Sequence, residues 1–194
     1  MTDKKADIFN AGRELFYSNG FKDTNISDIA KLAGIGVGTF YNYYSSKEKL
    51  FLEVYIKENE NHKKHLFESM NLKDDPVNMI TKMVAQNASE MNSNPILKEW
   101  YNKELFSKLE KQFYVQDGIE NFDEITHSGM TELIRKWKAD GKIRNDLDDE
   151  MIIAIFKSIL YIEIHKSEIG FQHFPQIILY ITEFIMKGLA DCPK

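Results

Sequence analysis

A short stretch near the N-terminus combines small, hydroxyl-bearing, amide and basic side chains. Glycine lets another backbone approach closely, Thr and Asn can contact base edges in a DNA groove, and Tyr hydroxyls donate to phosphates. A lysine beside the amides that begin a helix suits phosphate. The side chains concerned are Val37, Gly38, Thr39, Tyr41, Asn42, Tyr43 and Lys47. Together they favour non-covalent contact with nucleic acid.

Two other groups of residues suggest different chemistry. Glu58, His62 and His65 have a spacing that can hold a metal on one helix face, but residues 57–65 are almost wholly polar, which favours a solvated face. Residues 34–38 resemble a dinucleotide-binding loop, but they follow a predicted helix rather than a strand. We therefore predict neither a metal site nor a cofactor.

The sequence contains no catalytic set and no sign of export. No nucleophile lies in a Gly-x-Ser-x-Gly turn, so we do not expect an enzyme. Cys192 is the only cysteine, which excludes a disulfide within the chain and favours a reducing, cytoplasmic setting. The N-terminus lacks the apolar core of a signal peptide. No run approaches the roughly 20 apolar residues of a membrane span.

Helices must position the candidate contact residues, because helical spacing of apolar residues recurs along the chain. Ile8, Ala11 and Leu15 show this spacing in the first segment. Glycine and proline separate the segments that follow. The expected helices span residues 4–18, 26–33, 37–43, 46–70, 76–91, 95–114, 119–140, 148–168 and 174–190. We predict an all-α fold of about nine helices.

The second and third expected helices form a helix-turn-helix. Residues 34–36 supply a tight glycine-containing turn between them, and the second helix of such a pair can enter the major groove of DNA. Phe40 and Tyr44 share one side of that helix and are expected in a small core. The candidate contact residues then lie on its other side.

These residues closely resemble the tetracycline-repressor (TetR) family of bacterial regulators. The resemblance rests on residues 11–16 with Gly20 and Phe21, on residues 24–30 with Ala33 and Gly34, and on residues 38–44 with Lys47, Glu48 and Leu50. It covers roughly the first 55 residues. It implies that Thr24, Asn25 and Lys47 contact phosphates and that Gly36 precedes the recognition helix. The family often has Ser near the position of Gly36, where glycine offers no side-chain contact.

The remainder of the chain is expected to form a second domain. We predict a DNA-binding domain over residues 1–46 and an effector-binding and dimerisation domain over residues 47–194, with helix 46–70 shared. Apolar pockets form between the helices of bundles, and the resemblance implies a small-molecule effector in this domain. The expected pocket residues are Trp100, Tyr101, Leu105, Phe113, Trp137, Phe156 and Tyr161.

The last two expected helices are apolar on more than one face, so each must be buried on more than one side. One side can pack in the domain core, and the other can pack against a second copy in a four-helix bundle with twofold symmetry. The expected interface residues are Ile152, Ile155, Ile159, Ile162, Ile178, Ile181 and Ile185.

The net charge of −5 is unevenly distributed. Residues 1–50 hold 7 basic and 6 acidic residues, a balance of +1, whereas the remainder holds 18 basic and 24 acidic residues, a balance of −6. The acidity therefore belongs to the second domain. A nearly neutral DNA-binding domain predicts modest non-specific affinity and a shallow salt dependence.

We expect a homodimeric transcription regulator, most simply a repressor. It would bind a palindromic operator in double-stranded DNA and be released by an effector that is not identified by the sequence. The alternative is a helical adaptor that binds protein through the apolar C-terminal helices and has lost DNA binding.

Overall fold

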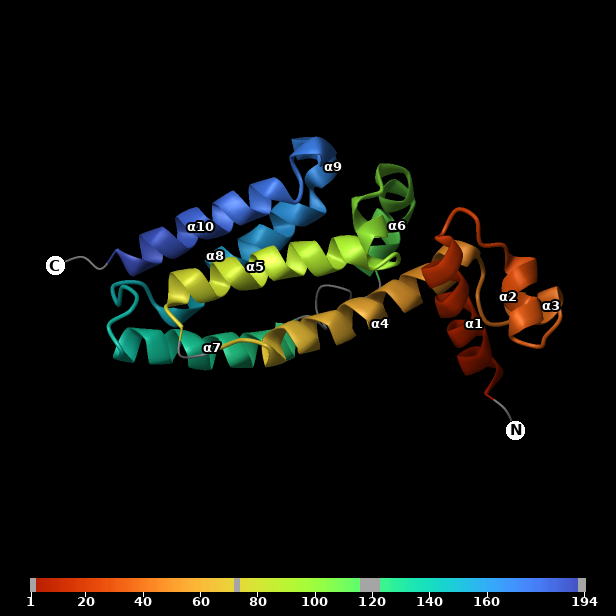
Figure 1. Ribbon diagram of the computed structural model, residues 1–194, viewed down its shortest axis with the longest axis horizontal. Helices are drawn as coiled ribbons and strands as arrows, with labels where there is room; N and C mark the ends of the chain where they lie inside the picture. Colours follow the sequence, from red (N-terminus) through yellow and green to blue (C-terminus); the bar gives the residue numbers. More distant parts are fainter. Residues whose placement is uncertain (1–2, 72–73, 116–122, 192–194) are drawn as a thin grey trace. The chain divides into compact units, whose positions relative to one another are not determined.

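The computed structural model describes residues 3–71, 74–115 and 123–191, and it describes side chains outside residues 110–128. Every regular element in these ranges is a helix (Figure 1), which confirms the all-α fold. The elements are α1 Lys4–Asn19, α2 Ile26–Leu32, α3 Val37–Tyr41, α4 Lys47–Glu68, α5 Pro76–Ser93, η1 Leu97–Tyr101, α6 Lys103–Val115, α7 Asp123–Ala139, α8 Asp149–Ile164, α9 Lys166–Ile169, η2 Phe171–His173 and α10 Gln176–Ala190.

The chain divides into two compact units. Unit 1 comprises Met1–His65 and Glu90–Phe113, and unit 2 comprises Leu66–Ser89 and Tyr114–Lys194. The predicted domain boundary after residue 46 falls inside unit 1, so the DNA-binding and effector-binding domains stay predictions about function. In the described part of the chain, no helix is both long and apolar enough to cross a membrane.

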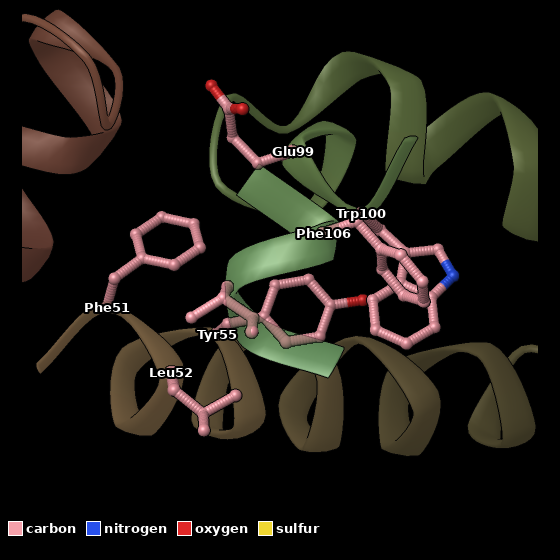
Figure 2. Close-up of a pocket in the computed structure, with 7 residues that line it drawn as sticks. Phe51, Leu52, Tyr55, Glu99, Trp100 and Phe106 are labelled. Atoms are coloured by element: carbon pink, nitrogen blue, oxygen red, sulfur yellow. The ribbon is translucent and has the colours of Figure 1, made fainter. Parts of the chain in front are cut away.

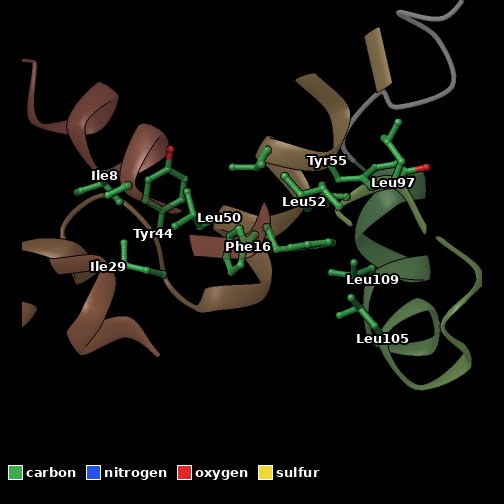
Figure 3. Close-up of a cluster of buried hydrophobic side chains, with 14 of the residues drawn as sticks. Ile8, Phe16, Ile29, Tyr44, Leu50, Leu52, Tyr55, Leu97, Leu105 and Leu109 are labelled. Atoms are coloured by element: carbon green, nitrogen blue, oxygen red, sulfur yellow. The ribbon is translucent and has the colours of Figure 1, made fainter. Parts of the chain in front are cut away.

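Unit 1 has one apolar core that runs from α1 through α4 to η1 and α6 (Figure 3). Helix α1 begins at Asp3, whose carboxylate accepts hydrogen bonds from the backbone N–H groups of Lys5 and Ala6. Gly12 brings α1 close to α4, since a Cβ on Gly12 would lie 2.6 Å from the Leu50 Cδ2 atom. Any residue with a Cβ at this position would therefore require the Leu50 side chain to move.

A series of aromatic contacts extends through this core. Phe51 on α4 meets Phe16 and Phe21 edge to face, with ring centroids 5.1 and 5.0 Å apart. One turn along α4, Tyr55 stacks on Trp100 of η1 at 5.5 Å. Such ring pairs add to the free energy gained by burying their apolar area. They link α1, the turn that follows it, α4 and η1 within unit 1.

Unit 2 is built on α5, α7, α8 and α10. Its buried core includes Ile80, Ile134, Trp137, Ile152 and Met186. The turn between α7 and α8 is held by Lys138, whose ammonium donates to the Leu147 carbonyl at 2.6 Å and to the Asp149 carboxylate at 2.8 Å. Helix α8 itself is capped by Asp148, whose carboxylate accepts from the Met151 N–H group at 2.6 Å.

Two of the predicted helices are interrupted. The predicted helix 95–114 is wrong as one element, because η1 ends at Tyr101. The next residue, Asn102, has an extended backbone, and its side chain accepts from the N–H groups of Glu104 and Leu105. An asparagine with this geometry starts a new helix. The predicted helix 148–168 divides at His165, where the backbone leaves helical geometry. Local capping therefore overrides the continuous apolar pattern.

Candidate nucleic-acid interface

Helices α2 and α3 form the predicted helix-turn-helix. Gly34 adopts a φ of +67°, a left-handed conformation that glycine accepts without strain. The N–H group of Ile35 then donates to the Ala30 carbonyl at 2.9 Å, which closes the turn. Phe40 and Tyr44 are both buried, as predicted, so the orientation of α3 is fixed by packing.

The opposite side of α3 is open. Tyr41 is 54% exposed, and Val37 and Tyr43 are each 43% exposed. Gly38 and Asn42 are exposed as well, while Thr39 is half-buried. A Cβ placed on Gly36 or Gly38 would meet nothing within 4 Å, so packing within this chain does not require either glycine. The fold thus brings these predicted contact residues together on one accessible face.

Two predicted phosphate contacts are instead bonded within the domain. Thr24 is fully buried, and its hydroxyl donates to the carbonyls of Leu15 and Gly20. The Lys47 ammonium donates to the carbonyls of Phe21 and Thr24, and burial lowers its pKa. The polar groups of Thr24 and Lys47 are thus directed at backbone carbonyls of the same domain, whereas most of the predicted contact side chains of α3 are exposed to solvent.

Asn25 lies at the start of α2 and is exposed. Its side-chain amide approaches the Asp28 carboxylate at 3.4 Å. Leu32, which ends α2, is 48% exposed and is not among the predicted contact residues. In the sequence, the only signal that Leu32 faces outward was that it lies off the side of α2 that carries Ile29 and Ala33.

The polar stretch 57–65 is not a solvated face throughout, so that interpretation is wrong for Glu58 and His62. Glu58 is buried and accepts from Arg13 at 2.5 Å and from Asn94 at 3.2 Å. The His62 Nδ1 atom lies 3.1 Å from a Glu90 carboxylate oxygen. Among the described residues, no group of three His, Cys, Asp or Glu side chains is arranged to hold a metal ion.

A small apolar hollow lies in unit 1 between α4 and the η1–α6 segment. Its lining residues are Phe51, Leu52, Tyr55, Glu99, Trp100, Phe106 and Leu109. Figure 2 shows the rings of Tyr55, Trp100 and Phe106 gathered together, with the Glu99 carboxylate directed away from them. That carboxylate accepts from the Asn102 amide at 2.7 Å.

The predicted effector-pocket residues are divided between the two units. Trp100, Tyr101 and Leu105 belong to or pack against the core of unit 1, and only Trp100 lines the hollow. Trp137 and Phe156 belong to or pack against the core of unit 2, whereas Tyr161 is exposed. The Phe113 side chain lies outside the described residues. The pocket therefore stays a prediction.

The predicted interface isoleucines differ in their burial. Ile152 is fully buried in the core of unit 2, and Ile185 packs against that core. The remaining predicted residues, Ile155, Ile159, Ile162, Ile178 and Ile181, are half-buried. The most exposed large apolar side chains of α8 and α10 are instead Met151, Tyr161, Tyr180 and Phe184.

Comparison with known proteins gives the first domain a family. Residues 8–54 match the model for bacterial regulatory proteins of the tetR family. The uncharacterised HTH-type transcriptional regulator YhgD of Bacillus subtilis is 40% identical over 53 residues, which are 27% of this chain and 28% of YhgD. UidR of Escherichia coli, also an HTH-type transcriptional regulator, is 38% identical over 53 residues, 27% of each chain. The chain thus aligns with little more than a quarter of the length of these relatives.

Solved structures extend the similarity in fold to nearly the whole chain. RolR in complex with resorcinol has a TM-score of 0.64 at 16% identity, covering 96% of this chain and 87% of RolR. FadR of Thermus thermophilus in complex with lauroyl-CoA has a TM-score of 0.53 at 18% identity, covering 94% and 91%. The match over residues 8–54 and the helix-turn-helix that those residues form identify this N-terminal segment as a DNA-binding domain of the kind found in bacterial regulatory proteins of the tetR family.

Proposed function

We propose that the protein is a homodimeric transcriptional repressor of the cytoplasm that binds a palindromic operator and is released by a small-molecule effector. The observation that carries this proposal is the open face of α3. Two glycines there have no packing role, and exposed Val37, Tyr41 and Tyr43 surround them. The glycines leave the backbone uncovered, and the hydroxyl and apolar side chains beside them can contact base edges in a major groove of DNA.

An electrophoretic shift with the DNA upstream of the protein's own gene tests the proposal. We expect salt-sensitive binding to a palindrome in that region. Absence of binding to any such sequence would favour the alternative, a helical adaptor that acts through its C-terminal helices. The exposed apolar residues of α8 and α10 would then be the surface to examine.

Glycine at position 38 provides a sharper test. Gly38→Ala should leave the free energy of unfolding unchanged or raise it by up to about 1 kcal/mol, because alanine favours a helix. It should nevertheless weaken DNA binding, because the new methyl group lies on the proposed contact face. Gly129→Ala in α7 is the matched control, since its Cβ would meet Phe67 at an ordinary 3.5 Å. Equal DNA affinity for both variants would count against α3 as the reading helix.

Base contacts and phosphate contacts should separate in mutants. Thr39→Ala should change the preferred operator sequence, because a side chain that reads a base carries sequence information. Tyr43→Phe should weaken binding to all sequences by about two- to tenfold, the value of one hydrogen bond. Binding-site selection from a randomised duplex pool measures both effects. A changed preference in Tyr43→Phe alone would reverse the two assignments.

The exposed apolar side chains of α8 and α10 support a homodimer. Tyr161 on α8 is 55% exposed, and Phe184 on α10 is 65% exposed. Helices α8 and α10 contact one another within unit 2. Two such pairs would form a four-helix bundle around a twofold axis, which covers these side chains. The recognition helices could then meet successive major grooves about 34–36 Å apart.

Regulation by a small molecule is proposed for the second domain. RolR and the Thermus FadR, which share this fold, were solved with resorcinol and with lauroyl-CoA. Screening small organic molecules for a rise in Tm would identify candidate effectors. A true effector should release the DNA, and by linkage the DNA should weaken effector binding by the same factor. A compound that raises Tm without changing DNA affinity would not be the inducer.

A further inference from the structure

The turn between α1 and α2 is held by two side chains that together bond four backbone carbonyls. The single O–H group of Thr24 is shared between the Gly20 carbonyl at 2.7 Å and the Leu15 carbonyl at 3.1 Å. The Lys47 ammonium donates to the Phe21 carbonyl at 2.7 Å and to the Thr24 carbonyl at 2.6 Å. Buried backbone acceptors need such partners. We call this set of contacts the turn clamp.

The environment of Lys47 favours this internal role. Its Nζ atom lies 4.3 Å from the centre of the Phe21 ring, within range of a cation–π contact. The side chain is only half-exposed, and burial lowers its pKa, which agrees with an ammonium partly removed from water. Charge-assisted hydrogen bonds to two carbonyls compensate for that loss of hydration.

The clamp also closes a loop in the chain. Lys47 is the first residue of α4, and the carbonyls that it binds precede α2. Helices α2 and α3 lie between these two points in the sequence and contact each other. One side chain therefore ties both ends of the helix-turn-helix together.

We propose that Lys47 and Thr24 are positioning residues, which set the orientation of the helix-turn-helix for DNA and do not themselves neutralise phosphates. The proposal rests on the proposed DNA-binding function. It differs from the role expected for both side chains from the family resemblance. It predicts that their removal lowers affinity without reducing the number of counterions released on binding.

The DNA arm of the test uses two labelled duplexes of equal length, one from the region upstream of the protein's own gene and one of random sequence. Lys47→Met should weaken binding to the upstream duplex about tenfold and lower its preference over the random one. The slope of log K against log salt should stay the same. Loss of a phosphate contact would instead reduce that slope by about one, and this result would overturn the proposal.

Thr24 supplies a second and independent set of variants. Thr24→Val keeps the shape of the side chain but removes the hydroxyl, so it should also lower the sequence preference. Thr24→Ser keeps the hydroxyl and should retain the wild-type preference. If Thr24→Val kept the wild-type preference while Thr24→Ser lowered it, the methyl group rather than the hydrogen bonds would matter, and the clamp would be rejected. Lys98→Met removes an exposed charge outside the helix-turn-helix and is the matched control.

The DNA-free arm measures amide hydrogen exchange in the full chain. Residues 20–25 should exchange faster in Lys47→Met and Thr24→Val than in wild type or Lys98→Met, because the turn loses its ties. Unchanged exchange in both variants would refute the clamp. A wild-type protein that binds no DNA would contradict the proposed function alone, because exchange in the turn is decided without DNA.

Discussion

The carboxylate of Glu58 on α4 accepts a hydrogen bond from the Arg13 guanidinium on α1, with 2.5 Å between Oε1 and Nε. Its second oxygen accepts from the Asn94 amide at 3.2 Å. Asn94 also accepts from the backbone N–H groups of Ile96 and Leu97, which begin η1. One buried carboxylate thus connects α1, α4 and the residues that lead into η1.

Arg13→Met should therefore destabilise the protein. The change keeps a long apolar stem but leaves the buried Glu58 carboxylate with one fewer donor. Because the Arg13 side chain is 54% exposed, the expected cost in urea unfolding is about 1–2 kcal/mol, below that of a fully buried pair. Lys57→Met is the control, since it breaks the exposed pair with Glu60 and should cost less than about 0.5 kcal/mol. Equal losses of unfolding free energy in Arg13→Met and Lys57→Met would mean that burial of Glu58 does not strengthen its contact with Arg13.

Gly12→Ala tests the close approach of α1 and α4. Alanine in place of glycine normally favours a helix by about 1 kcal/mol. Here the new Cβ would lie 2.6 Å from Cδ2 of Leu50, which is fully buried. We expect a net loss of about 1–2 kcal/mol in the free energy of unfolding, measured against Gly129→Ala, which should gain stability. A stabilised Gly12→Ala would show that Leu50 can repack.

The helix-turn-helix was predictable because its signals are local. Glycine positions the turn, and the spacing of Phe40 and Tyr44 sets the buried side of α3. The family model that matches residues 8–54 confirms the resemblance of residues 11–50 to the TetR family.

The internal polar contacts could not be predicted, because they depend on residues far apart in sequence. Glu58 lies in a polar stretch that looks solvated until Arg13, which is 45 positions away, is placed beside it. Lys47 looks like a phosphate ligand until the turn that carries the Phe21 and Thr24 carbonyls, 26 and 23 positions earlier, folds against it. Charge and spacing identify polar residues, but tertiary packing decides whether their partner is DNA or backbone.

Alkaline pH should reveal the burial of Tyr44. Burial, and then the negative charge of Glu53, raises the pKa of the Tyr44 phenol above its ordinary value of 10.0. Below about pH 10 the phenol is protonated in both the folded and the unfolded state, and its stabilising contribution is fully present. Above that pH the unfolded state loses the proton first, so stability falls. Urea unfolding between about pH 8 and pH 11 should show this extra fall in wild type and not in Tyr44→Phe. Parallel pH profiles would contradict the raised pKa.

Phe184→Glu should separate the proposed dimer into monomers. Phe184 is 65% exposed and stacks on Tyr180 of the same helix, with ring centroids 6.4 Å apart. A carboxylate at this position costs little in a monomer because water reaches it, but two would be desolvated and would repel each other across a twofold interface.

Sedimentation equilibrium measures this outcome directly. Wild type should have twice the monomer mass of 22.7 kDa, and Phe184→Glu should approach the monomer mass with unchanged helix content. Tyr17→Glu, at a similarly exposed aromatic residue of unit 1, should remain dimeric. DNA binding should weaken in Phe184→Glu alone, because a monomer meets only one half-site. A dimeric Phe184→Glu protein would exclude this face of α10 from the interface.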